Sequence, residues 1–353
     1  MTLTVTELPQ AGYELVLLGS DPSAGYRAIV AIHDTTLGPG AGGARLWPYT
    51  SDAEALADAL RLARAMTYKS AVAGLPLGGA KAVIIAPPVP GFDRERLFLA
   101  HGRFVESLGG RYLTAEDVGT STTDMAIVRR ETRHVAGVEG EADPSPFTAH
   151  GVFRAMQAAA RWRWDSDDLA GRTIALQGCG NVGSALAREL HRAGARLVVS
   201  DLARERAERL EAECGATVVP PEAITEVDAD VFAPCALGGS LNGDTIPRLR
   251  VAVVTGAANN QLADASAGSA LAARGILYAP DFVANAGGVL SAGPDQLGWP
   301  VETAWARIRA IYDTILDLFA EAERGHVPPH VAAEQLAERI LRQAREKRAA
   351  LRA

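Results

Sequence analysis

Two lysines flank a glycine-rich turn, and their spacing suggests a reaction that needs a basic amine. Lys69 ends the segment 66–69, and Lys81 directly follows the glycine-containing segment 77–80. Glycines let the backbone approach a ligand closely, so Lys81 is delivered to the same point as that ligand. A lysine that is desolvated and lies near a second cation loses its proton more readily and can act as a base. We therefore expect one of the two lysines to act as a base and the other to stay charged and hold an anion, rather than two unrelated surface lysines.

A second glycine pattern follows an apolar run at residues 172–177, which predicts a buried strand. The apolar spacing of residues 185–193 predicts a helix, and residues 196–201 predict the next strand. A glycine turn between a strand and a helix is typical of a dinucleotide site, in which the pyrophosphate lies on the helix N-terminus. The residues expected to bind the dinucleotide at this turn are Gly178, Gly180, Asn181, Val182 and Gly183.

Asp201 ends the second of these strands, where an acidic residue would bond the ribose of the adenosine. A carboxylate would repel the additional phosphate of NADP, so the sequence favours NAD as the cofactor. Arg204 and Arg206 lie close by in the sequence and weaken that preference.

The composition predicts a large two-domain protein. The chain has 353 residues with 48% hydrophobic content and a formal net charge of −7, which does not suggest a nucleic-acid partner. No apolar run approaches the roughly 20 residues of a membrane span, and the N-terminus does not resemble a signal peptide, so we expect a cytoplasmic protein. The three cysteines, Cys179, Cys214 and Cys235, have no metal-like spacing, and we expect neither a metal site nor a disulfide framework.

The order of predicted elements indicates an α/β fold with two domains and a cleft between them. We expect residues 1–145 to form an α/β substrate-binding and oligomerisation domain, on which a C-terminal helix at 326–353 packs back. Residues 146–325 are expected to form a Rossmann domain that binds NAD. The tripeptide Pro144-Ser145-Pro146 is the expected hinge, Asp52 is the expected cap of a helix that runs to Lys69, and residues 302–325 are expected to form one long helix.

With these motifs the chain resembles the glutamate/leucine/phenylalanine/valine dehydrogenase family, which oxidises amino acids with a nicotinamide cofactor. The resemblance covers most of the chain and is closest to the leucine and phenylalanine branches. The segments that carry it are residues 31–34, 38–43, 66–69, 78–81, 115–119, 178–183, 256–260 and 279–288.

The resemblance implies a role for each matched polar residue. Lys69 would pair with the substrate carboxylate, Lys81 would be the base that activates water, and Asp117 would manage the protons of the amino group. Taken alone, Asp117 would suit a loop-capping carboxylate equally well, and the matched asparagines would more often be turn residues. The remaining implied positions are Gly42, Gly43 and Asn259 for the substrate, and Thr148, Ala257 and Asn285 for the cofactor. The resemblance also implies a homo-oligomer.

Three apolar residues in or beside the matched loops, Ala41, Met66 and Val289, are the candidates for the wall of the side-chain pocket. They offer no partner for a second carboxylate, so we expect an apolar L-amino acid, converted to its 2-oxo acid and ammonia. The alanine at Ala41 resembles the residue of the phenylalanine branch at this position, and the valine at Val289 resembles that of the leucine branch. The sequence therefore leaves open which substrate side chain is preferred. Hydrophobic pockets separate shapes that differ by one methylene by only about 1–3 kcal/mol, so we expect broad specificity.

Two other classes of protein remain possible on the sequence alone. A 2-hydroxy-acid dehydrogenase would not need two lysines with Asp117 and would normally present a catalytic histidine. A catalytically silent NAD-binding assembly protein would not need the full set of catalytic positions.

Overall fold

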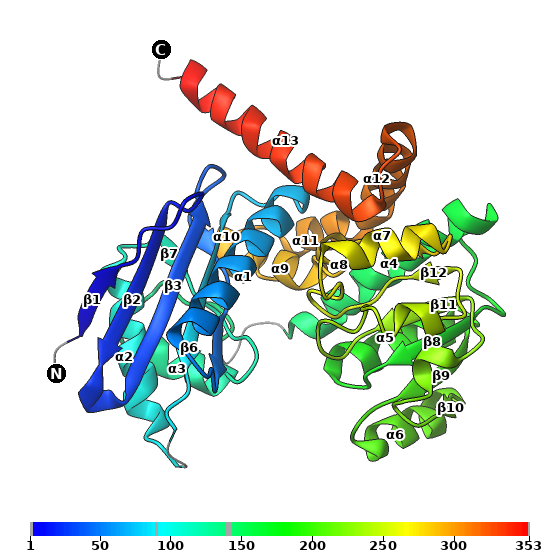
Figure 1. Cartoon of the computed structure of the whole chain (residues 1–353), viewed down its shortest axis with the longest axis horizontal. Helices are drawn as coiled ribbons and strands as arrows, with labels where there is room; N and C mark the ends of the chain where they lie inside the picture. The colour runs from blue at the N-terminus through cyan, green and yellow to red at the C-terminus, as the bar shows by residue number, and fades with distance from the viewer. Residues whose placement is uncertain (1–2, 89–90, 139–142, 352–353) are drawn as a thin grey trace. The chain divides into compact units, whose positions relative to one another are not determined.

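Residues 143–336 separate from the rest of the chain as one folding unit, while residues 1–142 together with 337–353 form the other. The computed structural model describes residues 3–88, 91–138 and 143–351 (Figure 1). The outer ends of the predicted first domain, residues 1–2 and 352–353, lie outside the described residues. The C-terminal segment of the first unit begins at residue 337, inside a helix, rather than at residue 326 as predicted.

The first unit is built on a mixed seven-stranded sheet in the order β1-β2-β3-β6-β4-β7, with β5 also paired to β6. Strands β1, β2, β3 and β6 are antiparallel neighbours, whereas β4 and β5 run parallel to β6. The strands are β1 (Thr4–Glu7), β2 (Leu15–Asp21), β3 (Tyr26–Asp34), β4 (Gly40–Ala41), β5 (Ala44–Trp47), β6 (Gly78–Ile85) and β7 (Tyr112–Leu113).

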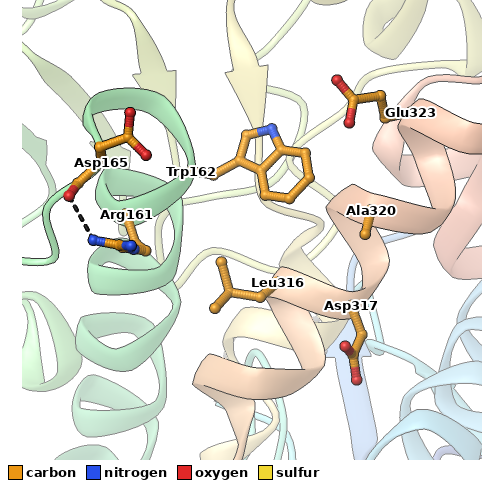
Figure 2. Close-up of a pocket in the computed structure, with 7 residues that line it drawn as sticks. All are labelled: Arg161, Trp162, Asp165, Leu316, Asp317, Ala320 and Glu323. Carbon is orange, nitrogen blue, oxygen red and sulfur yellow. Dashed lines mark hydrogen bonds between the residues drawn. The ribbon is translucent and has the colours of Figure 1, made fainter.

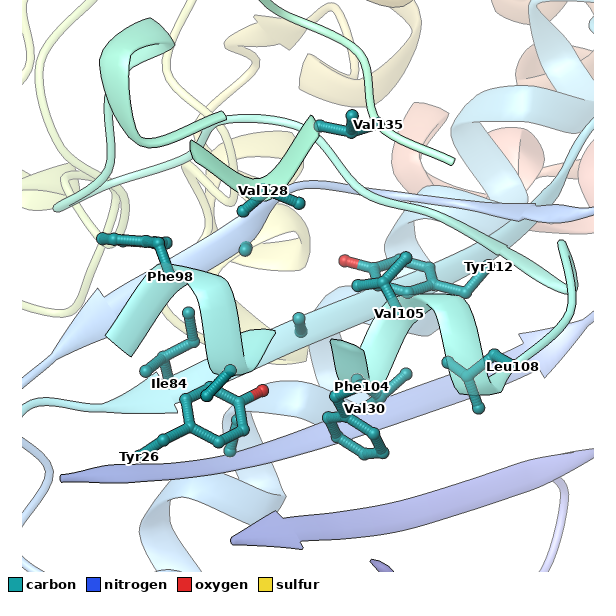
Figure 3. Packing of buried hydrophobic residues seen from close by; sticks show 14 of the residues in the cluster. Tyr26, Val30, Ile84, Phe98, Phe104, Val105, Leu108, Tyr112, Val128 and Val135 are labelled. Carbon is teal, nitrogen blue, oxygen red and sulfur yellow. The ribbon is translucent and has the colours of Figure 1, made fainter. Parts of the chain in front are cut away.

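The two faces of this sheet are both buried, which explains why β3 and β6 are largely apolar. Residues of even number in β3, such as Val30, pack with Ile84 and Phe98 in one core cluster (Figure 3). Residues of odd number, such as Ile29, pack with Val83 in a second cluster that contains alanines of α1. Side chains alternate between the two faces of a strand, so Lys81 belongs to the same face of β6 as Val83. The chain thereby places Lys81 toward α1.

Three helices accompany the sheet of the first unit: α1 (Asp52–Val72), α2 (Arg94–Ser107) and α3 (Thr122–Arg129). Ser51, rather than Asp52, caps α1, since its hydroxyl accepts the backbone N–H of Glu54. Asp52 is instead the first helical residue and pairs with Arg27 of β3. The predicted cap was therefore wrong by one residue.

The second unit is built on a six-stranded parallel sheet in the order β10-β9-β8-β11-β12-β13. The strands are β8 (Thr173–Gln177), β9 (Arg196–Ser200), β10 (Thr217–Val218), β11 (Val231–Pro234), β12 (Val253–Val254) and β13 (Leu277–Tyr278). Ligands bind at the carboxyl ends of the strands in such sheets, beside the point where the strand order reverses. Here β8 is that point, because β9 lies on one side of it and β11 on the other.

The helices of the second unit are α4 (Pro144–Trp164), α5 (Asn181–Arg192), α6 (Arg204–Cys214), α7 (Ala265–Ala273), α8 (Asp281–Ala284), α9 (Gly287–Ser291), α10 (Gly293–Leu297), α11 (Val301–Arg309), α12 (Ile311–Gly325) and the start of α13 (Pro329–Ala350). Residues 144–146, the predicted hinge, form the first turn of α4, capped by Asp143, directly after the boundary between the two units. Proline is tolerated in a first helical turn, where its missing N–H costs no hydrogen bond. The long helix expected over residues 302–325 is interrupted at Ala310.

Among the described residues, no helix is long and apolar enough to cross a membrane. Within the same part of the chain, no group of three or more His, Cys, Asp or Glu side chains is placed to hold a metal ion.

Candidate active site

Lys81 and Asp117 form an ion pair in the first unit. The distance between Lys81 Nζ and Asp117 Oδ1 is 3.0 Å, and the side chain of Lys81 is only 6% exposed. Burial lowers the pKa of Lys81 below its ordinary value, and the positive charge of Arg45 lowers it further, against the opposing charge of Asp117. The amine of Lys81 therefore loses its proton more readily than that of an ordinary lysine, as the sequence predicted. The sequence had named Lys69 as the second cation, and the structure adds Arg45, which the sequence did not indicate.

Asp117 contacts two cations at once. Its Oδ1 faces Lys81, while its Oδ2 accepts a hydrogen bond of 2.8 Å from Arg45 Nε. Although burial by itself would raise the pKa of Asp117, the charges of Lys81 and Arg45 hold it below its ordinary value. Asp117 is thus an ionised carboxylate. In its loop it is the hydroxyl of Thr120 that acts as a cap, since Thr120 Oγ1 accepts the backbone N–H of Asp117 at 2.8 Å.

The predicted substrate glycines lie where the backbone leaves no room for a side chain. A Cβ at Gly42 would lie 1.8 Å from the carbonyl oxygen of Ala80 and 3.3 Å from Met66 Cγ. A Cβ at Gly43 would lie 3.0 Å from Asp117 Cβ. The loop with Gly42 and Gly43 therefore passes directly over β6 and beside Asp117, and Gly42 lies close to Met66.

The other two sequence-predicted residues of this unit lie on neighbouring elements. Ala41 is in β4, which pairs with Gly79 of β6, and it is half-buried. Lys69 is a buried residue in the last turns of α1. Both elements contact β6, the strand that carries Lys81.

A buried polar network that the sequence did not indicate supports the Gly42 loop. Tyr112 OH donates to the carbonyl of Gly42 at 2.7 Å and contacts Thr114 Oγ1 at 3.1 Å. His101 lies 3.4 Å from the same Thr114 hydroxyl through Nε2, and its Nδ1 is 2.9 Å from Tyr26 OH. Burial lowers the pKa of His101 to about 3, so its ring is neutral. His101 therefore has a structural role.

Arg45, Asp58 and Tyr49 form the part of the site that sequence reasoning missed. Arg45 is opposite Val83 in the pairing of β5 with β6, so its side chain belongs to the same face as Lys81. Asp58 of α1 accepts from an Arg45 terminal nitrogen at 3.0 Å and from Tyr49 OH at 2.6 Å. Arg45 ends the glycine-rich stretch 38–45, and that position was the only local signal of its role.

In the second unit, the glycine turn joins β8 to the N-terminus of α5. Gly178 has a φ of +98°, which favours glycine, and a Cβ at Gly183 would lie 1.9 Å from the carbonyl oxygen of Gly178. A Cβ at Gly180 would meet nothing within 4 Å. Asn181 and Val182 begin α5 directly after its N-cap, Gly180, which has no side chain to accept the N–H groups of the first turn. The helix N-terminus and the space at Gly180 fit a pyrophosphate that needs close backbone contact.

Asp201 follows β9 and helps to hold the turn. Its Oδ2 accepts the N–H of Cys179 at 2.7 Å, and its Oδ1 accepts the N–H of Ala203 at 2.8 Å. Each carboxylate oxygen can accept a further hydrogen bond, so the contacts leave capacity for a ribose hydroxyl. Leu202, which is 91% exposed, offers an apolar surface directly beside this carboxylate.

Asn285 is the clearest sign of a ligand in the second unit. Its Nδ2 donates to the carbonyl of Ala257 at 3.1 Å and to Asn259 Oδ1 at 3.0 Å, which also brings these predicted residues together. Its Oδ1 is buried and has no hydrogen-bond partner among the described residues. Such an oxygen is costly to bury unless a bound group donates to it, and the carboxamide of a nicotinamide has that donor. These residues therefore fit the cofactor that the sequence implied.

The two remaining predicted residues also lie in this unit. Thr148 Oγ1 donates to Pro144 O at 2.9 Å, and a Cβ at Gly288 would lie 2.7 Å from the same Thr148 oxygen. Val289 is the next residue of α9 and is half-buried. Thr148 and Val289 are thus carried by α4 and α9, which contact each other.

A groove elsewhere in the second unit has a different character. It has a volume of about 570 Å³ and lies between α4 and α12, with Trp162 facing Leu316 (Figure 2). Three carboxylates, Asp165, Asp317 and Glu323, line it. An anionic substrate would be repelled there, and the groove contains none of the predicted site residues.

Comparison with known proteins adds independent evidence. The family model described as "Glu/Leu/Phe/Val dehydrogenase, dimerisation domain" matches residues 19–134. The model described as "Glutamate/Leucine/Phenylalanine/Valine dehydrogenase" matches residues 140–203 and 199–348.

Individual relatives match over nearly the whole chain. The chain is 49% identical over 340 residues to a leucine dehydrogenase of Geobacillus stearothermophilus, covering 95% of this chain and 92% of the relative. It is 46% identical over 356 residues to a valine dehydrogenase of Streptomyces albus, covering 98% and 96%. The crystal structure of L-tryptophan dehydrogenase from Nostoc punctiforme matches with a TM-score of 0.82 at 44% identity, covering 95% and 97%. The chain belongs to the glutamate/leucine/phenylalanine/valine dehydrogenase family.

Proposed function

We propose that this amino-acid dehydrogenase uses NAD to deaminate apolar L-amino acids oxidatively, releasing the 2-oxo acid and ammonia, in a reversible reaction. The observation that carries the proposal is the buried Lys81–Asp117 pair, in which an amine of lowered pKa contacts an ionised carboxylate. A 2-hydroxy-acid dehydrogenase would not need this pair, and an assembly protein would not need to bury it at such cost.

The reaction follows from the charges that these side chains provide. When bound, the nicotinamide cofactor accepts a hydride from the α-carbon of the amino acid. The substrate becomes an iminium, and Lys81 takes a proton from the water that attacks it. Asp117 carries protons to and from the nitrogen, so that the resulting carbinolamine expels ammonia and leaves the 2-oxo acid. Lys69 pairs with the substrate carboxylate, and the backbone of Gly42 and Gly43 orients the substrate.

The proposed substrates are apolar because nothing in the proposed pocket would balance a second carboxylate. Burying an unpaired carboxylate costs several kcal/mol, and Ala41, Met66 and Val289 offer it no hydrogen-bond donor. Relatives named as leucine, valine and L-tryptophan dehydrogenases support a range of apolar side chains. The small side chain of Ala41 supports the inclusion of aromatic ones, such as that of phenylalanine.

The remaining roles concern the cofactor and the assembly. We assign Gly178, Gly180 and the start of α5 to the pyrophosphate, Asp201 to the ribose, and Asn285 with Thr148 to the carboxamide, while Asn259 contacts the substrate. Asp201 is the reason to propose NAD rather than NADP. We also infer a homo-oligomer, which the dimerisation-domain match supports, and light scattering of the purified protein would test it.

The decisive experiment is a panel of substrates. The formation of NADH is recorded at alkaline pH with each apolar L-amino acid, with L-glutamate and with the matching 2-hydroxy acids. We expect L-leucine, L-valine and L-phenylalanine to be oxidised faster than L-glutamate, and the hydroxy acids to be inert. A preference for L-glutamate would refute the proposed pocket, and oxidation of hydroxy acids alone would refute the reaction.

Replacing Ala41 with leucine tests the position of the pocket wall. The added volume should exclude a ring before it excludes a small branched chain, so kcat/KM for L-phenylalanine should fall more than that for L-valine. The ratio of the two values is the measurement. An unchanged ratio would show that Ala41 does not contact the substrate side chain.

A further inference from the structure

The carboxylate of Asp117 is held from both sides, and only one of its partners belongs to the proposed chemistry. Lys81 Nζ contacts Oδ1 at 3.0 Å, and Arg45 Nε donates to Oδ2 at 2.8 Å. The two contacts together fix the rotation of the carboxylate, so that Oδ1 faces the lysine. Without Arg45, the carboxylate would be free to turn about its side-chain bonds.

Arg45 is in turn held by Asp58. One terminal nitrogen of Arg45 donates to Asp58 Oδ2 at 3.0 Å, and Tyr49 OH donates to the same oxygen at 2.6 Å. The opposite oxygen, Oδ1, accepts from Arg61 at 2.6 Å. The side chains of Arg45 and Asp58 are 17% and 16% exposed, so both charges are largely removed from water. The planar guanidinium thus bridges two carboxylates on different elements, which a lysine could not do.

We propose that Arg45 and Asp58 are positioning residues for the oxidation of the amino acid, Arg45 by fixing Asp117 beside Lys81 and Asp58 by fixing Arg45. This inference rests on the proposed function. Neither residue is a catalyst, because each acts on the substrate only through Asp117 and Lys81.

The same geometry gives Arg45 and Asp58 opposite electrostatic effects on Lys81. The positive charge of Arg45 lowers the pKa of Lys81, whereas the negative charge of Asp58 raises it. Asp117, from the segment after β7, also raises it. The residue of β3 opposite Lys81 is Ala31, which has no charge, and α1 additionally carries Lys69.

The signs predict opposite shifts in the pH profile. In Arg45→Gln a cation is lost, so the pKa of Lys81 rises and the base form is reached only at higher pH. The low-pH limb of the profile, in which kcat/KM rises with pH, should therefore move to higher pH by about one unit. In Asp58→Asn an anion is lost, so the same limb should move down by a similar amount. The amino acid is the same in all measurements, so its own ionisation cannot produce a difference between the variants.

Two further variants separate positioning from general stability. Arg45→Lys keeps the charge but cannot reach both carboxylates, so its limb should stay near that of the wild type while kcat falls. Arg27→Gln is the matched control, since Arg27 joins β3 to Asp52 of α1 much as Arg45 joins β5 to Asp58 of α1. It should change neither the limb nor kcat.

The experiment records kcat/KM and kcat against pH for the wild type and these four variants, using the apolar L-amino acid that the wild type oxidises fastest. Limbs that move in opposite directions in Arg45→Gln and Asp58→Asn, together with a lower kcat at an unmoved limb in Arg45→Lys, support the proposal. Limbs that stay in place, or move in the same direction while activity falls, overturn it. If Arg45→Gln does not fold, Asp58→Asn decides by the direction of its shift.

A second readout does not depend on turnover. Cyanate reacts with the unprotonated amine of lysine, and mass spectrometry of the peptide that contains Lys81 gives the rate of carbamylation at each pH. The midpoints of these rates should shift in the two directions given above. If they do so while the wild type oxidises no amino acid, the proposed function fails and the coupling of Arg45 and Asp58 to Lys81 stands. If the wild type is active and the midpoints do not move, the positioning role fails instead.

Discussion

Replacing Lys81 with alanine should lower kcat by about 10³-fold, because general bases contribute on that order to proton transfer. The same variant should bind NAD as the wild type does, since Lys81 lies in β6 of the first unit and the glycine turn in the second. Stopped-flow or steady-state rates and a titration of NAD by calorimetry measure the two effects. Normal turnover in Lys81→Ala would end the proposed mechanism.

Lys69→Ala should behave differently. Loss of an anchor weakens the ground state and the transition state together, so KM for the amino acid should rise more than kcat falls. The two lysine variants serve as controls for each other. Equal losses of kcat in both would show that the roles are not divided as proposed.

Asp201→Ser should narrow the preference for NAD over NADP. The substitution removes the charge that would repel a 2′-phosphate, and serine can still accept one of the two backbone hydrogen bonds that Asp201 accepts from Cys179 and Ala203. The ratio of kcat/KM for the two cofactors measures the effect. A ratio unchanged from the wild type would remove Asp201 from the ribose site.

For individual residues, the sequence predicted features that depend on neighbours in the chain, and it missed contacts between residues that are far apart in the chain. Lys81 follows its glycines directly, and its lowered pKa could be expected from the chemistry of a crowded loop. The sequence named Lys69 as the neighbouring cation, because Lys69 is close in the chain, and it did not indicate Arg45, which also contributes to this shift. Arg45 reaches Asp117 only through the pairing of β5 with β6, and no spacing of residue types announces that contact.

Among the elements, strand β6 carries Lys81 and helix α1 carries Lys69. A glycine sets the distance between this strand and this helix. A Cβ at Gly79 would lie 2.1 Å from both the backbone nitrogen and the hydroxyl of Thr67. Gly79→Ala must therefore push the strand away from the helix that carries Met66 and Lys69. We expect a loss of about 3 kcal/mol in the free energy of unfolding, as for an overpacked core.

Chemical denaturation measures that loss, and Gly180→Ala is the control. A Cβ at Gly180 meets nothing within 4 Å, so this second variant should unfold like the wild type while it binds NAD more weakly. If Gly79→Ala is as stable as the wild type, then β6 and α1 are not packed as closely as described.

The elements themselves were predicted unevenly, for physical reasons. The strand, glycine turn and helix at β8 and α5 carry strong signals, since an apolar run, glycines and a helical stripe all agree. The segment around Ala310 contains neither glycine nor proline, so nothing local indicated that α11 ends there and α12 begins. At residues 144–146 two prolines suggested a hinge, but prolines also suit the first turn of a helix, and that is where they lie.

In the whole molecule, helix α13 lies at the C-terminal end of the chain and contacts elements near its N-terminal end. Its first residues belong to the second unit and residues from 337 onward to the first. Glu338 accepts a hydrogen bond from Tyr68, the neighbour of Lys69, and Arg345 pairs with Asp34 at the end of β3. The C-terminus was predicted to pack back on the first domain, but contacts between residues so distant in sequence could not be assigned from the pattern. The predicted cleft between the domains stays a prediction.

Leu341→Ala tests whether α13 supports the substrate site. Leu341 is 1% exposed, and its truncation should lower the free energy of unfolding by about 2–4 kcal/mol and lower Tm. Because the same helix contacts Tyr68, KM for the amino acid should also rise. Arg342→Ala, at the exposed neighbouring position, is the control and should change neither value. An unaltered Tm in Leu341→Ala would mean that the helix end contributes little.

The buried contacts of His101 have a consequence for how the protein responds to its surroundings. Burial lowers the pKa of His101 to about 3 and raises the pKa of Tyr26 and of Tyr112, so the support that runs from Tyr26 through His101, Thr114 and Tyr112 to the carbonyl of Gly42 keeps the same protons around neutral pH. A change of pH can therefore alter the rate of the reaction without loosening the loop that receives the substrate. The protein separates a scaffold that is indifferent to pH from a reacting pair that is sensitive to it.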